Sequence, residues 1–283
     1  MIRPQENIPL DESLQVPSHV DWRERLRMSV VKDQKKGAGC EFSHAFALLS
    51  ALELHHFIHT GIHSNLSEQE IIDCVKLNIG CDRADDNSFN YIMENGIAIE
   101  QNYPYETNRG KCRTNILPKS DVKVYGFAKV EGKESLKKAL DQFGPLTVKV
   151  KSSIKSFYFY KQGVFNDSMC NESSFDHEVV LVGYETGRSD HWIIKNSWSR
   201  FWGENGYMRI AMNDKETFCI DINSAYFPLL EQSAINDNKV IFFPNASFVL
   251  VTVLMVLMIL NGCLFSFFIA KWTKCFCVGL MGV

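Results

Sequence analysis

Two nucleophilic side chains stand three residues apart in the stretch CEFSHAF, which runs from Cys40 to Phe46. A cysteine thiol or a serine hydroxyl attacks a carbonyl carbon when a neighbouring histidine activates it. Apolar residues recur at helical spacing from Phe42 to Phe57, so either nucleophile would lie near the beginning of a helix. This arrangement makes covalent catalysis the first hypothesis to examine.

A second stretch, HHFIHTGIH, contains side chains that could hold a metal ion. His55 and His59 stand four residues apart on the same predicted helix, a spacing that metal sites use. No carboxylate completes a ligand set in this segment, and the sequence has no CxxC pair. We therefore interpret the stretch as a solvated helix end, and we expect neither a metal nor a cofactor.

The composition indicates a globular protein with disulfides. The chain is 46% hydrophobic and 22% charged. Its formal charge of −3, with no Lys/Arg-rich block, argues against nucleic acid as a partner. Six of the nine cysteines lie in the polar part of the chain, and an even set of this kind is typical of three disulfides formed in an oxidising compartment.

The pattern of the sequence changes near residue 121. Before it, three helices are predicted: one closed by Gly61, one begun by a capping box of Ser67 and Glu70, and one ended by Gly96. After it, one predicted helix, KESLKKALDQFG, lies among strand-like stretches, which are DVKVYGFAKV, PLTVKVK, HEVVLVGY, HWIIKN and GYMRIAM. The sequence thus predicts an α+β fold with two sub-domains and a ligand-binding cleft between them.

Several motifs together resemble the papain-like, or cathepsin-like, cysteine proteases. They lie within residues 16–228 and read VPSHVDWRE, VKDQ ahead of CEFSHAF, LSEQEIIDC, NIGC, NYPYE, FDHEVVLVGY and KNSWSRFWGENGY. The resemblance implies that family's peptidase domain, with a helical part at about 16–120 and a β-barrel-like part at about 121–228. It also implies three disulfides, which are Cys40–Cys81, Cys74–Cys112 and Cys170–Cys219.

The resemblance further implies roles for individual residues. In the family, a cysteine at a helix N-terminus is ionised by a histidine, an asparagine orients the imidazole, and a glutamine side chain helps to form the oxyanion hole. The matching positions here are Ser43 for the nucleophile, His177, Asn196 and Gln34, with Trp198 as a shield and Asp176 in the substrate cleft.

Three departures from the family pattern predict weak or absent activity. Ser43 replaces the cysteine, and asparagine in place of aspartate lowers the turnover of a serine triad by about 10⁴. Gln34 lies six residues before Cys40 where the family has three, which should displace an oxyanion donor worth about 10²–10³ in turnover. Arg83 and Ala84 replace glycines at which the substrate backbone approaches.

A rival alignment makes Cys40 the nucleophile. The distance from Gln34 to Cys40 is six residues, which equals the family's distance from its glutamine to its catalytic cysteine. This alignment requires three extra residues inside the helix ahead of ALLSALE, and it leaves Cys81 without a partner. Because loops absorb insertions better than packed helices, we favour Ser43 and keep Cys40 as the alternative.

An apolar segment at residues 246–270 contains no charged side chain. At about 1.5 Å per residue it is long enough to cross a hydrocarbon core of about 30 Å, which predicts one transmembrane helix. Lys271 and Lys274 follow it, so the positive-inside rule predicts a cytosolic tail at 271–283. The globular domain, joined by a linker at 229–245, would then be extracellular or in the lumen of a secretory or lysosome-like compartment.

The amino-terminal lead at residues 1–15 conflicts with this topology, because it has no apolar stretch of the kind that signal peptides contain. Either the upstream part of a precursor is missing from this chain, or the carboxy-terminal helix is the only membrane signal. In the second case the domain would face the cytosol and the disulfides would be in doubt.

Two functional hypotheses follow. The first is a membrane-anchored pseudoprotease of papain-like fold whose cleft binds a peptide or protein ligand. The second is a weak endopeptidase that hydrolyses peptide bonds through Ser43 or Cys40, with His177 and Asn196.

Overall fold

The structure is a computed structural model, and it describes most of the chain up to residue 230. The described residues are 10, 13, 15–26, 28–34, 42–75, 85–113, 118–171, 175–187, 189–212 and 219–230. The chain divides into two units, Met1–Ile241 and Phe242–Val283, and every described residue lies in the first. Four predicted site or disulfide residues and the predicted membrane helix lie outside the described residues, namely Cys40, Cys81, Arg83, Ala84 and 246–270.

The described elements follow the predicted order of helices and then strands, with a short strand and a helical turn ahead of them. In chain order they are β1 (His19–Asp21), α1 (Trp22–Arg25), α2 (Ser43–Thr60), α3 (Glu68–Cys74), α4 (Asp85–Asn95), β2 (Gly126–Val130), α5 (Lys133–Gln142), β3 (Leu146–Val150), α6 (Lys155–Tyr158), β4 (Val164–Phe165), the 3₁₀ helix η2 (Ser168–Asn171), β5 (His177–Glu185), β6 (His191–Lys195), β7 (Tyr207–Ala211) and β8 (Ala225–Leu229).

The strands form one sheet in the order β2-β8-β3-β5-β6-β7-β4, and β1 pairs with β5. Neighbouring strands run antiparallel except β4 and β7, which are parallel. β1 can approach β5 closely because residue 183 is glycine: a Cβ atom there would clash with the carbonyl oxygen of Val20. The amino-terminal segment is thereby tied to the centre of the β-rich half.

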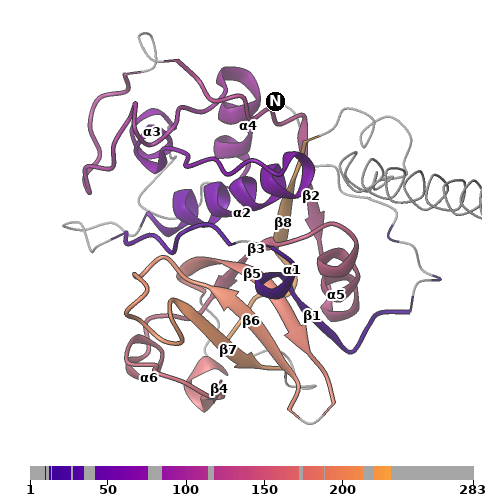
Figure 1. The fold of residues 1–283 in the computed structure, drawn as a ribbon. Helices are drawn as coiled ribbons and strands as arrows, with labels where there is room; N and C mark the ends of the chain where they lie inside the picture. Colours follow the sequence, from indigo (N-terminus) through magenta and orange to yellow (C-terminus); the bar gives the residue numbers. More distant parts are fainter. Residues whose placement is uncertain are drawn as a thin grey trace, which may run out of the picture. The chain divides into compact units, whose positions relative to one another are not determined.

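Helix α2 separates two hydrophobic cores. Figure 1 shows it with α3 and α4 on one side and strands β3 and β5 on the other. One face contributes to the core over the sheet through Ala47, Ala51 and Leu54, while the other packs with α3 and α4 through residues such as Leu49 and Leu52. A helix that packs against cores on two sides is a buried helix, which explains why every residue of α2 from Ser43 to His56 is buried.

The predicted helix ends are confirmed, with one difference at α3. Gly61 and Gly96 adopt φ values of 72° and 67°, the left-handed conformation that favours glycine after a helix. Ser67 Oγ accepts a 3.1 Å hydrogen bond from the Glu70 N–H, as the capping box requires. The Glu70 carboxylate, however, accepts a 2.7 Å hydrogen bond from the Ala98 N–H, so it joins α3 to the next segment and does not complete the box.

The predicted strand at 121–130 is shorter than expected, because β2 begins only at Gly126. Val122 and Val124 are buried, while Lys123 between them and Asp121 and Tyr125 on either side are exposed. An extended segment that lies on a core gives this alternation even where it pairs with no strand.

The interpretation of HHFIHTGIH as a solvated helix end is wrong for His55. This side chain is 2% exposed, and its Nε2 donates a 2.8 Å hydrogen bond to the Pro145 carbonyl oxygen. Its ring stacks on Phe227 with centroids 5.8 Å apart. Burial lowers the pKa of His55 to about 4, so it is a neutral core residue.

Two of the implied disulfides are present among the described residues, Cys74–Cys112 and Cys170–Cys219, with Cα–Cα distances of 4.7 and 4.9 Å. Such bonds form in an oxidising compartment, so they indicate a secreted or lumenal domain. Within the described part of the chain, no helix is both long and apolar enough to cross a membrane.

Candidate active site

The sheet brings His177 and Asn196 together although 19 positions separate them. His177 is the first residue of β5, and Asn196 directly follows the last residue of β6. Because β5 and β6 are antiparallel neighbours, the start of one and the end of the other lie at the same edge. The two side chains are buried there, and His177 Nε2 lies 2.8 Å from Asn196 Oδ1.

The hydrogen bonds fix the protonation of the imidazole. The Ser197 N–H can only donate, and it donates 2.8 Å to Asn196 Oδ1, which identifies that atom as the amide oxygen. His177 Nε2 must therefore donate to it, which leaves the lone pair on Nδ1. Burial lowers the pKa of His177 to about 4, and the Asn196 hydrogen bond and Asp176 oppose this only in part. At neutral pH His177 is a neutral base in a fixed tautomer.

Ser43 lies at the start of α2, next to the histidine. Its Oγ accepts a 3.1 Å hydrogen bond from the backbone N–H of Glu178, the residue that follows His177. Phe42 is the N-cap residue, so α2 begins at Ser43. The hydroxyl thus occupies the position that a helix N-terminus makes favourable for a developing negative charge.

Gln34 is held beside this pair. Ser197 Oγ donates a 2.6 Å hydrogen bond to Gln34 Oε1, and the Gln34 N–H donates 2.9 Å to the Ser197 carbonyl. The Tyr105 hydroxyl holds the Gln34 carbonyl from the other side. These contacts fix Gln34 beside Ser197, and the predicted displacement of its side chain from the oxyanion position stays a prediction. The lengthened segment that follows it, 35–41, lies outside the described residues.

Trp198 and Asp176 flank the histidine. The Trp198 ring lies over the His177 ring with centroids 4.8 Å apart, which shields the imidazole from water. Burial would raise the pKa of Asp176, but hydrogen bonds from Ser153 and Ser152 outweigh it and hold the pKa below its usual value. Asp176 is thus an anion that fixes the loop before His177.

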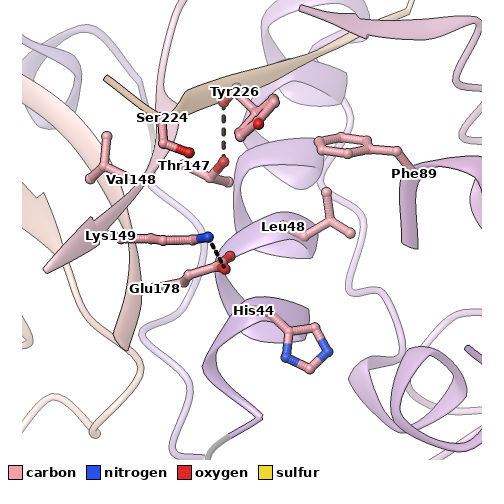
Figure 2. A pocket seen from close by; sticks show the side chains of 9 residues that line it. All are labelled: His44, Leu48, Phe89, Thr147, Val148, Lys149, Glu178, Ser224 and Tyr226. Atoms are coloured by element: carbon pink, nitrogen blue, oxygen red, sulfur yellow. Dashed lines mark hydrogen bonds and ion pairs between the residues drawn. The ribbon is translucent and has the colours of Figure 1, made fainter. Parts of the chain in front are cut away.

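A small pocket adjoins the site, lined by the residues that follow Ser43 and His177 (Figure 2). Its walls include His44, Lys149, Glu178 and Tyr226, and its volume is about 20 Å³. Lys149 and Glu178 form an ion pair at 3.9 Å. His44 Nε2 has no hydrogen-bond partner among the described residues, and burial with nearby positive charges lowers the pKa of His44 to about 4. The motifs gave no signal for this pocket.

One cluster of possible metal ligands occurs in the described part of the chain, at His19, Asp21 and Glu24. Arg23 donates to both carboxylate oxygens of Asp21, with the shortest distance 2.6 Å. Since the guanidinium already neutralises the buried carboxylate and repels a cation, this cluster does not suit a metal.

Comparisons with known proteins agree with this geometry. The model of the "Papain family cysteine protease" family matches residues 16–228. Cathepsin L of Sarcophaga peregrina is 40% identical over 221 residues, which cover 75% of this chain and 63% of that protein. Procathepsin L of Mus musculus is 35% identical over 229 residues, covering 77% of this chain and 66% of that protein. The chain thus spans slightly less than two thirds of these relatives.

A solved structure gives the same fold. Bromelain protease from Ananas comosus, in complex with the E64 inhibitor, superimposes with a TM-score of 0.68 at 34% identity and covers 76% of this chain and 100% of that one. The family match extends over both halves of the α+β fold and includes Ser43, His177 and Asn196. The chain belongs to the papain family of cysteine proteases.

Proposed function

We propose that this chain is a membrane-anchored papain-family domain with impaired peptidase activity, and that its cleft binds a peptide or protein. The observation that carries the proposal is the contact of Ser43 with the backbone beside a neutral His177 that is oriented by Asn196. A cysteine at this position would be a thiolate in the resting enzyme, whereas a serine hydroxyl keeps its proton until the transition state.

The electrostatics of the pair disfavour serine chemistry. As the hydroxyl loses its proton, His177 must become a buried imidazolium, yet burial holds its pKa at about 4. Serine enzymes stabilise that cation with a carboxylate, while Asn196 offers only an amide oxygen. Replacing aspartate by asparagine in a serine triad lowers turnover by about 10⁴, and we expect a penalty of that order here.

The pocket beside the site supports weak substrate binding. Its volume of about 20 Å³ holds little more than one water molecule, and a charged pair, Lys149 and Glu178, lies at its wall. A substrate side chain would have to displace these groups. Arg83 and Ala84, in place of the family's glycines, add to this obstacle.

The alternative is a weak endopeptidase. It is favoured by the intact His177–Asn196 pair and by the anchoring of Gln34 at the same site. The nucleophile would be Ser43, or Cys40 if the lengthened segment carries its thiol to the histidine.

An active-site-directed epoxide that reacts with thiolates separates the two proposals. We expect no labelling of wild-type protein under conditions in which a Ser43→Cys variant is labelled, because Cys40 is expected in a disulfide with Cys81. Peptide mapping identifies the modified residue. Labelling of Cys40 in the wild-type protein would favour the endopeptidase with the Cys40 register.

The membrane anchor rests on residues 246–270 and on Lys271 and Lys274 after them. We expect the globular domain to resist added protease in sealed vesicles from expressing cells and to be digested once detergent opens them. The two disulfides support this lumenal or extracellular orientation. Digestion in intact vesicles, with the domain released on the cytosolic side, would contradict it.

A further inference from the structure

Three aromatic side chains project from the surface beside Trp198. Tyr158 and Phe159, at the end of α6, are 44% and 67% exposed. Phe201 is 84% exposed, more than any other large apolar side chain in the described part of the chain. These three residues, named the aromatic face below, have no role in the chemistry at His177.

The aromatic face packs against neighbouring aromatic rings. The Tyr158 ring lies 5.1 Å from that of Phe159 and 5.7 Å from that of Trp198, measured between centroids. Trp202 Nε1 donates a 3.0 Å hydrogen bond to the Tyr158 carbonyl oxygen. The rings border a hollow of about 390 Å³, but Phe159 and Phe201 extend into solvent from its rim. Side chains that project in this way suit insertion into an apolar layer better than enclosure of a ligand.

The charges around the aromatic face are mainly positive. Lys155, Lys161 and Arg200 are exposed, and the Arg200 guanidinium lies 5.8 Å from the Phe201 ring centroid. None of these three cations forms an ion pair with a described residue. Asp33 lines the hollow and Asp167 accepts a hydrogen bond from a serine of α6, so the three cations outnumber the two carboxylates. Aromatic rings mixed with lysine and arginine are typical of surfaces that bind at the level of anionic lipid headgroups.

We propose that the aromatic face docks on an anionic bilayer, the same membrane in which residues 246–270 are anchored. This inference rests on the anchor in the proposed function. The 15 residues from 231 to 245 reach at most about 50 Å when fully extended, so the domain cannot leave the vicinity of the bilayer. Such a tether raises the effective concentration of lipid at the face, and a weak contact then suffices.

Docking would restrict access to one side of the catalytic site. Gln34 and Trp198 line the same hollow as the aromatic face. A bilayer at Phe159 and Phe201 would therefore lie against the Gln34 side of the site and exclude bulky folded proteins from it. Ligands that approach along the bilayer, or from the opposite side of the site, would still enter.

The test uses the full chain in lipid nanodiscs and tryptophan fluorescence. A Trp272→Phe background removes the tryptophan next to the apolar segment, and Trp22 and Trp192 are buried. Lipids with brominated acyl chains should then quench Trp198, the partly exposed tryptophan that borders the aromatic face, in discs that contain phosphatidylserine. Quenching should be weaker in phosphatidylcholine discs and at high salt, since salt screens exposed charges beyond about 8 Å.

Two independent variants keep the test decisive. Phe159→Ser with Phe201→Ser removes the projecting rings, and Lys161→Glu with Arg200→Glu reverses the charge; each should abolish the quenching. Ile62→Ser, at another exposed apolar residue, is the matched control and should not change it. Quenching that survives in both variants, or that is absent from phosphatidylserine discs, would overturn the proposal.

Two further outcomes separate the hypotheses. If the chain does not elute together with phosphatidylcholine discs, the membrane anchor is rejected. Docking would then be tested by elution with phosphatidylserine discs, which we expect for the wild-type chain and for neither variant. A fluorescence response to a digest of casein peptides, with no response to lipid, would assign the aromatic face to peptide binding and reject docking.

Discussion

A Ser43→Cys variant is expected to gain thiol reactivity without gaining efficient peptide turnover. The new thiol would lie at the N-terminus of α2, which favours a thiolate, and close to His177, whose Nδ1 can accept the thiol proton. It should therefore react with a small alkylating reagent much faster than any thiol of the wild-type protein. Its kcat/KM on a mixed peptide library should stay well below about 10⁴ M⁻¹s⁻¹, the lower end of ordinary enzymes.

The reason is that a better nucleophile repairs neither substrate alignment nor the oxyanion hole. A second variant, with the 35–40 segment shortened by three residues and glycine at both 83 and 84, should gain more than Ser43→Cys alone. Ordinary cathepsin-like turnover by Ser43→Cys alone would show that only the nucleophile is defective and that the altered segments are harmless.

Acid is expected to destabilise the domain strongly. Burial lowers the pKa of His44, His55 and His177 to about 4 each, while an unfolded histidine titrates near 6.5. As the pH falls from 6.5 to 4, these three histidines become protonated in the unfolded chain but stay neutral in the folded chain. Above pH 6.5 the neutral histidines make their full contribution to the free energy of unfolding. Toward pH 4 this contribution is lost, and it amounts to about 1.4 kcal/mol for each unit by which the folded and unfolded pKa values differ. We expect a loss of several kcal/mol in the free energy of unfolding.

Urea unfolding at a series of pH values checks this prediction. A His55→Gln variant keeps a donor for the Pro145 carbonyl oxygen but cannot take up a proton, so its stability should fall less steeply with pH than that of the parent. His63→Gln, at an exposed residue, is the control and should match the parent slope. Equal slopes for all three proteins would show that the buried imidazoles do not govern the acid sensitivity. A steep loss would favour a near-neutral extracellular or secretory setting over an acidic lumen.

Local signals in the sequence predicted much of the fold. Gly61 and Gly96 end helices because only glycine adopts φ near 70° without strain, and Ser67 begins one because its hydroxyl accepts from the first turn. β8 is not among the predicted strands, and it contains Pro228, a residue that is unusual in the middle of a sheet. In the structure Pro228 pairs with Phe127 of β2, whereas β3 pairs with β8 at Tyr226. The proline therefore lies at a position of β8 that pairs with one neighbouring strand and not with both.

Contacts between distant segments account for what the sequence could not predict. The burial of His55 depends on Pro145, 90 positions away, so helical spacing alone could not distinguish it from a solvated residue. The anchoring of Gln34 depends on Ser197, 163 positions away, a contact that the spacing of residues along the chain does not reveal. The motifs shared with the papain family pointed to His177 and Asn196, and the antiparallel pairing of β5 and β6 brings these two side chains together.

We infer that Ser43 is not a working nucleophile. The most direct test compares kcat/KM of the wild-type protein and of a Ser43→Ala variant on the same peptide library, with a His177→Ala variant as a second reference. We expect all three proteins to give the same background rate, because burial makes His177 a weak base and Asn196 supplies no charge to stabilise the imidazolium that must form. Robust turnover by the wild-type protein that Ser43→Ala abolishes would contradict it and would establish a serine-dependent peptidase.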